Sequence, residues 1–311
     1  MMSVHSRTVD LESKSPVSIV NIRLTSICNF KGKGYMKRFK TVHYTIHSDK
    51  IKDARGARFA VIADLHGVEL GHENRKLLET IDKYRPDGIL IAGDMIVRND
   101  PVTMETATVL LKRLAAQYPV YYALGNHEYK LYRSNPEENE IAEDYQEYES
   151  GLKAKGIHIL HNESCELEVG KNRMIIHGLE IPLIYYKKPF SPKLHTEEVR
   201  ELIGEPAKDT LNILLAHSPK YGNTYFDWGA DLTLSGHYHG GIVRLGRHKG
   251  LLSPQLQPFP AFCCGDFHRD SQHMLVSAGA GEHTIPVRIH NPRELLIVDI
   301  KPSVPTNMLK E

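Results

Sequence analysis

Short apolar runs alternate with amphipathic stretches in the first half of the chain, and this alternation constrains the fold more than any other feature. The apolar runs at residues 58–63, 88–92 and 120–124 have the length of buried strands. Residues 72–84 and 103–117, which lie between them, repeat apolar side chains at helical spacing. Units of strand, helix and strand cross over in the right-handed sense and build a largely parallel sheet. The sequence therefore predicts an α/β protein.

The rest of the chain is richer in predicted strands than in predicted helices. Residues 39–46 alternate apolar and polar side chains, as a half-buried strand does, and residues 137–149 and 195–203 favour helices. Further strands are predicted at 157–160, 166–169, 173–178, 211–216, 231–235, 274–277 and 294–300. The proline-rich residues 179–210 are expected to form a surface excursion that helps to select the substrate, together with residues 245–270.

Composition places the chain among ordinary soluble proteins. Of its 311 residues 41% are hydrophobic and 25% charged, and the net charge is +1, so the whole chain has no electrostatic bias toward nucleic acid. The four cysteines show no disulfide or zinc spacing, which favours thiols in a reducing compartment. No apolar run approaches the ~20 residues that span a bilayer, and the N-terminus has no secretory signal pattern. These features predict a cytoplasmic protein without a transmembrane segment.

The N-terminal residues 1–35 show no clear periodicity, and Met36 follows them like a natural start of translation. We interpret these residues as an extension that is disordered or lies upstream of the natural start; the competing interpretation is a short regulatory segment. Residues 36–305 are predicted to form one domain.

Polar residues follow five of the predicted strands directly. These are Asp64 and His66, Asp94, Asn126 with His127 and Glu128, His217, and His237 with His239. Because ligand sites in open α/β sheets lie at the carboxyl ends of the strands, we expect these residues to meet. Their carboxylate, amide and imidazole groups suit Mn²⁺, Fe or Zn²⁺. The other histidines have no matching motif and are expected to lie in the core or on the surface. Among them His283, in a glycine-rich turn, is the best candidate to approach the site.

The order and context of these motifs resemble the calcineurin-like metallophosphoesterase superfamily over roughly residues 57–300. The resemblance implies two packed mixed β-sheets flanked by helices, a four-layer α/β/β/α sandwich. Residues 228–241 resemble a bacterial subgroup of small phosphodiesterases, some of which are anchored at the membrane. Tyr238 departs from this subgroup, which often has a small hydroxyl residue at that position, and should alter the wall of the pocket.

The resemblance also assigns a role to each motif residue. Two divalent metal ions are implied, with the ligands Asp64, His66, Asp94 and His239 for the first and Asp94, Asn126, His217 and His237 for the second. Asp94 would bridge the two ions. His127 would assist catalysis as a proton donor or by stabilising the leaving oxygen, and Glu128 would orient a ligand or loop.

The implied reaction is hydrolysis of a phosphomonoester or a phosphodiester by in-line attack of metal-bound hydroxide, and of the two we favour the diester. A small nucleotide- or lipid-linked phosphoester is the expected substrate. No stable nucleic acid partner is expected, because Lys and Arg are not in excess. The alternative is a noncatalytic metal-binding scaffold that binds a partner protein. Because such scaffolds usually lack the Asn-His pair, Asn126 and His127 favour the enzyme.

Overall fold

The computed structural model describes residues 39–187, 190–246, 248–253, 258–282 and 287–303. The predicted extension at 1–35 and the candidate His283 lie outside these residues. Among the cysteines that are described, Cys165, Cys263 and Cys264 form no disulfide. Within the same residues, none of the helices combines the length and apolar character needed to cross a bilayer.

The first sheet has six strands in the order β1-β12-β2-β3-β4-β5. The four strands from β2 to β5 run parallel, whereas β12 is antiparallel to β2 and parallel to β1. Their bounds are Phe39–Ser48 for β1, Ala57–Ile62 for β2, Gly88–Ala92 for β3, Val120–Ala123 for β4, His158–Leu160 for β5 and Arg293–Pro302 for β12. The parallel β2, β3 and β4 bring three of the motifs to one edge of this sheet.

The second sheet also has six strands, in the order β10-β11-β9-β8-β7-β6. The central strands β7, β8, β9 and β11 run parallel, and β6 and β10 are antiparallel edge strands. Their bounds are Ser164–Val169 for β6, Asn172–Leu179 for β7, Leu211–Ala216 for β8, Leu232–Ser235 for β9, Gly265–Arg269 for β10 and Gln272–Val276 for β11. Both sheets are therefore mixed, as predicted.

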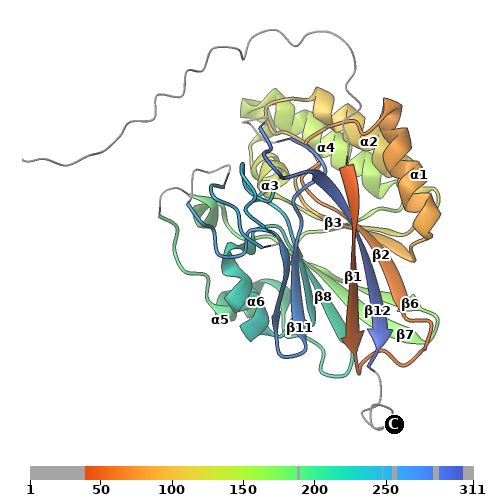
Figure 1. Ribbon diagram of the computed structural model, residues 1–311. Helices are drawn as coiled ribbons and strands as arrows, with labels where there is room; N and C mark the ends of the chain where they lie inside the picture. The colour runs from red at the N-terminus through yellow and green to blue at the C-terminus, as the bar shows by residue number, and fades with distance from the viewer. Residues whose placement is uncertain (1–38, 188–189, 247, 254–257, 283–286, 304–311) are drawn as a thin grey trace, which may run out of the picture. The chain divides into compact units, whose positions relative to one another are not determined.

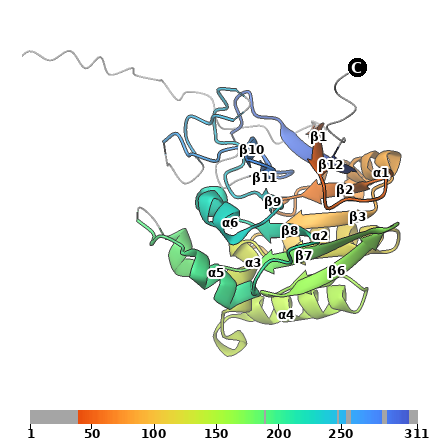
Figure 2. The same cartoon turned by 90° about the horizontal axis from the view of Figure 1, so that it is seen from below.

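Helices cover the outer face of each sheet (Figures 1 and 2). One apolar cluster joins the first sheet to α1, α2 and α4, a second lies between the sheets, and a third joins the second sheet to α5 and α6. The α-helices are Arg75–Tyr84 (α1), Val102–Ala115 (α2), Asn126–Tyr132 (α3), Glu140–Lys153 (α4), Thr196–Ile203 (α5) and Gly222–Trp228 (α6). Short 3₁₀ helices span His72–Asn74, Pro136–Glu138, Leu183–Tyr186 and Pro219–Tyr221. The predicted four-layer sandwich is confirmed.

Among the α-helices and strands that the structure describes, three were not predicted from the sequence, namely α3, α6 and β10. The helices α3 and α6 have seven residues each, which is too short for an apolar stripe to recur. The strand β10 (GDFHR) has one large apolar side chain and is held by its backbone pairing with β11. The predicted helix at 72–84 also begins differently, because a 3₁₀ turn with left-handed Glu73 and Asn74 precedes α1.

Candidate metal centre

The loops after β2 and β3 are held together by their backbones. The Asp64 amide donates to the Gly93 carbonyl at 2.9 Å, and the His66 amide donates to the Asp94 carbonyl at 3.1 Å. From the second sheet, the amide of His237 donates to both carboxylate oxygens of Asp64 at 2.9 and 3.1 Å. Hydrogen bonds donated by backbone amides thus bring the motifs of both sheets to one place.

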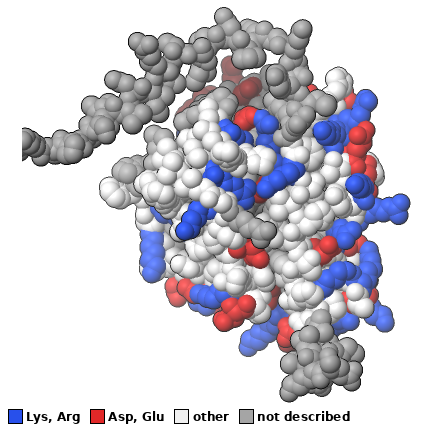
Figure 3. Space-filling model, viewed as in Figure 1, with Lys and Arg blue, Asp and Glu red and all other residues white. Residues whose placement is uncertain are grey.

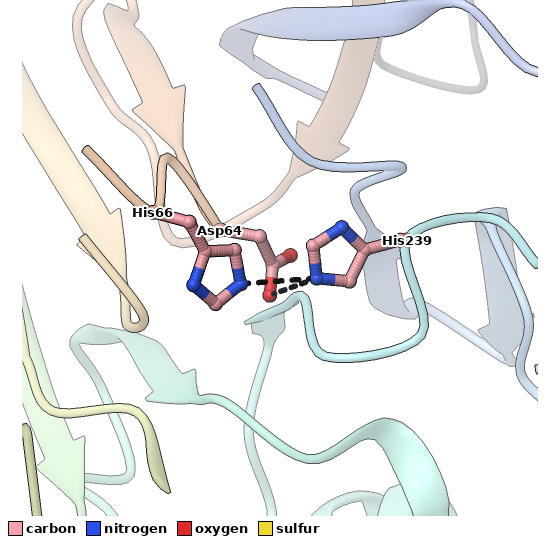
Figure 4. A group of neighbouring side chains, drawn as sticks. All are labelled: Asp64, His66 and His239. Atoms are coloured by element: carbon pink, nitrogen blue, oxygen red, sulfur yellow. Dashed lines mark hydrogen bonds and ion pairs between the residues drawn. The ribbon is translucent and has the colours of Figure 1, made fainter. Parts of the chain in front are cut away.

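Asp64, His66 and His239 form a first group of possible metal ligands, with one ligand atom of each within 4.8 Å of the others. Nε2 of His239 lies 3.4 Å from Oδ1 of Asp64 and 3.1 Å from Nε2 of His66 (Figure 4). All three residues are buried. Two imidazole nitrogens and a carboxylate oxygen that converge in this way can bind one divalent cation.

Asp94, His217 and His237 form a second group within the same distance limit. Nε2 of His217 lies 3.0 Å from Oδ2 of Asp94 and 3.2 Å from Nδ1 of His237. Nδ1 of His217 lies 2.7 Å from the Ala92 carbonyl, to which it can only donate. In neutral His217 the lone pair of Nε2 therefore faces Asp94.

Asp94 also connects the two groups. Its Oδ2 lies 3.9 Å from Nε2 of His66, and the carboxyl thus lies between ligand atoms of both groups. A carboxylate in this position can bridge two cations. Oδ1 of Asp94 accepts the amide hydrogen of His127 at 3.0 Å, which fixes the orientation of the carboxyl group.

The electrostatics and polar contacts of the centre fit a bound cation. Asp64 is 0% exposed and Asp94 is 3% exposed. Burial raises the pKa of Asp64 to about 7, and the negative charge of Asp94 adds to this effect although His217 opposes it. In addition, Oδ1 of Asn126 is buried and accepts no hydrogen bond from the described residues. Divalent cations would compensate the buried carboxylates and supply a partner for this oxygen.

The backbone at the motifs is strained. Asp64, His66, Asp94, His237 and His239 all have φ between 49° and 68°, in the left-handed region that side chains disfavour. Strain of this kind clusters at functional sites, where the surrounding structure holds it in place. Alternate residues of an extended strand point to one side, but Asp64-x-His66 and His237-x-His239 are not extended. The side chains converge because these backbones turn.

Two glycines permit the close approach of the loops. A Cβ atom on Gly93, which has φ of 85°, would lie 2.5 Å from Cα of Gly125. A Cβ atom on Gly125 would overlap the carboxyl group of Asp94. The loops after β3 and β4 can therefore touch only if both residues lack a side chain.

Glu128 is fully buried and holds the loop that carries Asp94. Its carboxylate accepts the amide hydrogens of Asp94, Met95, Ile96 and Gly125 at 2.6–3.2 Å. It also accepts the hydroxyl hydrogen of Tyr122 at 2.7 Å. This side chain orients a loop without lying in either group of possible ligands.

His127 is the second residue of α3, lies beside both groups and is partly exposed. Its ring centroid lies 5.0 Å from that of His66. Nδ1 accepts the amide hydrogen of Arg98 at 3.0 Å, so neutral His127 carries its proton on Nε2. Burial lowers the pKa of His127, although Asp94 opposes this effect.

Three residues near the centre were not singled out from the sequence. Arg288 donates to the carbonyls of Ala278 and Gly281 at 2.7 and 2.8 Å, and its Nη2 lies 3.3 Å from Nδ1 of His239. Asn291 donates to the His239 carbonyl. The ring of Tyr186 lies 5.3 Å from that of His237. All three come from irregular segments or a 3₁₀ helix, where no periodicity marks them.

Tyr238, which departs from the resembling subgroup, is buried with 3% of its surface exposed. Its ring lies 5.6 Å from that of His237. The side chain therefore lies inside the protein, next to His237.

Comparisons with known proteins identify the relatives of this chain. A family model described as calcineurin-like phosphoesterase matches residues 57–241. A Bacillus subtilis protein named as an uncharacterized metallophosphoesterase is 24% identical over 281 residues, which cover 87% of this chain and 90% of that protein. A Caenorhabditis elegans protein with a metallophosphoesterase name is 26% identical over 286 residues, or 82% of this chain. The chain spans 53% of the length of this nematode protein.

Solved structures show a weaker likeness. A dimetal phosphatase from Danio rerio is 10% identical, with a TM-score of 0.41 over 72% of this chain and 88% of that chain.

Proposed function

The chain belongs to the calcineurin-like phosphoesterase family, and from this premise we propose that it is a two-metal phosphodiesterase. The observation that carries the proposal is the pair of possible ligand groups that Asp94 connects, as a member of one group and a neighbour of His66 in the other. Asp64, His66 and His239 would hold one divalent ion with Asp94. His217, His237 and Asn126 would hold the second with the same carboxylate. Mn²⁺, Fe and Zn²⁺ all suit this mixture of oxygen and imidazole donors.

Two such ions, when bound, generate a hydroxide nucleophile at neutral pH and neutralise charge on the phosphoryl oxygens. The protein positions the groups around the reacting phosphorus. His127 would donate a hydrogen bond from Nε2 to the leaving oxygen and stabilise the negative charge that develops there, because its Nδ1 accepts the Arg98 amide hydrogen and the ring is neutral. Glu128 keeps Asp94 in place during this process through the amides of the loop.

A diester fits the surroundings better than a monoester. A monoester carries more negative charge, and Arg288 already donates to carbonyl groups beside the centre. The ring of Tyr186 lies 5.3 Å from that of His237, and the apolar group of a second ester could pack against it. We therefore propose a small phosphodiester, nucleotide- or lipid-linked, as the substrate class.

The test is hydrolysis of bis(4-nitrophenyl) phosphate and 4-nitrophenyl phosphate by metal-stripped protein that is resupplied with Mn²⁺. We expect metal-dependent turnover that favours the diester. The variant His127→Ala should lower kcat by about 10²–10³-fold, the usual effect of removing a hydrogen-bond donor to a developing negative charge. The matched control is His47→Ala, which removes an exposed histidine from the β1 strand.

Asp94→Asn separates the enzyme from the alternative of a noncatalytic scaffold. The amide cannot supply the anion between two cations, so turnover should be lost. Tight binding of two metal ions without turnover of either ester would favour a scaffold that binds a partner protein. Monoester turnover that exceeds diester turnover would contradict the diester assignment and leave the phosphoesterase intact.

A further inference from the structure

Asn291 is a buried polar residue beside the loop that follows β9. It lies just before β12, and its exposed fraction is 2%. Its Nδ2 donates to the carbonyls of His239 and Gly241 at 2.5 and 2.6 Å. Both N–H groups of the side-chain amide are therefore used by one short stretch of backbone. A buried donor that spans two carbonyls in this way fixes the path of the loop between them.

The stretch of loop that Asn291 spans is strained. His239, Gly240 and Gly241 follow one another with φ of 50°, 67° and 79°, all in the left-handed region. Such a conformation persists only where surrounding contacts hold it. The contact with Asn291 is close, because a Cβ atom on Gly240 would lie 2.6 Å from Oδ1 of Asn291. The two hydrogen bonds from Asn291 are therefore contacts that can hold this turn in place.

Residues 288–291 also hold the backbone beside another ligand of the first group. Arg288 donates to the carbonyls of Ala278 and Gly281 at 2.7 and 2.8 Å. The amide of Gly281 in turn donates to the Asp64 carbonyl at 2.7 Å. This short segment is thus connected to the loops of two ligands of the first group, one of them in each sheet.

The second group of ligands is held by other contacts. Nδ1 of His217 donates to the Ala92 carbonyl at 2.7 Å. The carboxylate of Glu128 accepts the amide hydrogen of Asp94 at 3.0 Å. Neither contact involves residues 288–291. The hydrogen bonds that orient Asp94 and His217 therefore come from a different part of the chain than those that fix the turn at His239.

We propose that Asn291 is a positioning residue for the first metal ion. It fixes the left-handed turn at His239, and this turn directs the imidazole toward Asp64 and His66 (Figure 4). Without its two hydrogen bonds the turn relaxes and the first ion loses a ligand, whereas Asp94 and His217 stay in place for the second ion. This inference rests on the proposed two-metal centre and adds that separate parts of the chain hold its two positions.

The test measures Mn²⁺ binding to the metal-stripped full chain by isothermal titration calorimetry, and the parent should bind two ions. Asn291→Ala removes both donors and should weaken one of the two binding steps by about 10–100-fold, the usual effect of losing a hydrogen-bonded partner of a metal ligand. Asn291→Ser retains one hydroxyl donor and should show a smaller loss of the same kind. Electron paramagnetic resonance gives a second readout, because two Mn²⁺ ions bridged by Asp94 couple magnetically and a single bound ion does not.

The matched control is Asn172→Ala. Asn172 is 1% exposed, and its side chain also holds a loop, because Oδ1 accepts the amide hydrogens of Lys52 and Asp53 at 2.9 Å. This variant should lose stability and retain both Mn²⁺ affinities. All of these substitutions replace neutral side chains and leave the Lys, Arg, Asp and Glu groups of Figure 3 unchanged. A loss of Mn²⁺ affinity would therefore not be an effect of surface charge.

Equal Mn²⁺ binding by the parent and both Asn291 variants would overturn the positioning role and leave the proposed phosphodiesterase intact. A similar weakening of both binding steps, or an equal weakening in Asn172→Ala, would assign Asn291 to the general stability of the fold and would also overturn this role. A parent that binds no Mn²⁺ would overturn the proposed function together with this inference.

Discussion

At the scale of single residues, the structure separates side chains that form the candidate site from those that position it. Glu128 stands outside the ligand groups, yet its carboxylate accepts hydrogen bonds from the Asp94 loop, from Gly125 and from Tyr122. The sequence could suggest that this residue orients a loop, because it follows Asn126 and His127. It could not show which amides are held.

Glu128→Gln tests this positioning role. The amide group of Gln has a single acceptor oxygen, and its NH₂ would face backbone N–H donors, so buried hydrogen bonds would be lost. We expect the affinity for Mn²⁺, measured by calorimetry, to fall by about 10–100-fold. Tyr122→Phe is the control, because it removes one donor and leaves the amide contacts. An unchanged Mn²⁺ affinity in Glu128→Gln would show that the loop holds its shape without the carboxylate.

The convergence of the motifs was predicted from residue types and strand ends, and the residues do meet. Their backbone conformations were not predictable, because left-handed φ at Asp64 or His239 depends on tertiary contacts and not on residue type. The position of Arg288 beside the site was also not predictable from the sequence. Its role depends on carbonyl groups that come from Ala278 and Gly281, and these positions have no sequence pattern.

At the scale of elements, strong periodicity decided what the sequence could predict. The buried strands β2, β3 and β4 were predicted within a residue or so, because each is a continuous apolar run that ends at a polar motif. The short helix α3 was not predicted, because it begins at Asn126 within the motif of Asn126, His127 and Glu128. The position of the site was predictable, because ligand sites in open α/β sheets lie at the carboxyl ends of the strands. The local geometry of its loops was not predictable, because it depends on tertiary packing.

Ion pairs also connect separate elements, and those of His161 are the clearest example. Nε2 of His161 lies 2.9 Å from Glu149 of α4, and Nδ1 lies 2.8 Å from Glu180, which follows β7. Burial lowers the pKa of His161, but hydrogen bonds to Glu149 and Glu180 outweigh it and raise the pKa to about 9. Burial likewise opposes the effect of His161 and Lys153 on Glu149, whose pKa falls to about 2.

This cluster predicts a pH-dependent contribution to stability. A raised histidine pKa stabilises the fold below the ordinary value of 6.5, and the contribution is lost as pH rises through about 9. The lowered pKa of Glu149 stabilises the fold above 4.5, and that contribution is lost as pH falls toward about 2. The unfolding free energies of the parent and of His161→Gln should therefore differ most between pH 4.5 and pH 6.5. The difference should shrink as the pH rises toward about 9.

Urea unfolding of both proteins at acidic, neutral and alkaline pH would measure this difference. Groups that titrate elsewhere affect both proteins equally and cancel in the comparison. His158→Gln, at an exposed position of β5, is the control and should show no such trend. A difference that stays constant from the acidic to the alkaline range would contradict the ion-pair explanation.

At the scale of the whole molecule, the candidate ligands come from both sheets. Asp64 and Asp94 follow β2 and β3 of the first sheet, whereas His217, His237 and His239 follow β8 and β9 of the second. Apolar packing already joins the sheets along their inner faces. Bound metal ions would add a polar link at one edge, and metal occupancy would then affect the stability of the entire sandwich.

Chelation should therefore lower the unfolding temperature of the whole domain. A ligand present at 100 times its Kd stabilises the folded state by about 2.7 kcal/mol, so Mn²⁺ should raise Tm by several degrees over protein treated with a chelator. His239→Ala removes a ligand of the second sheet and should diminish this rise, while His47→Ala should preserve it. Differential scanning calorimetry gives both values. An equal rise in His239→Ala would mean that Mn²⁺ stabilises the fold from another site, and the link between the sheets would not involve the metal centre.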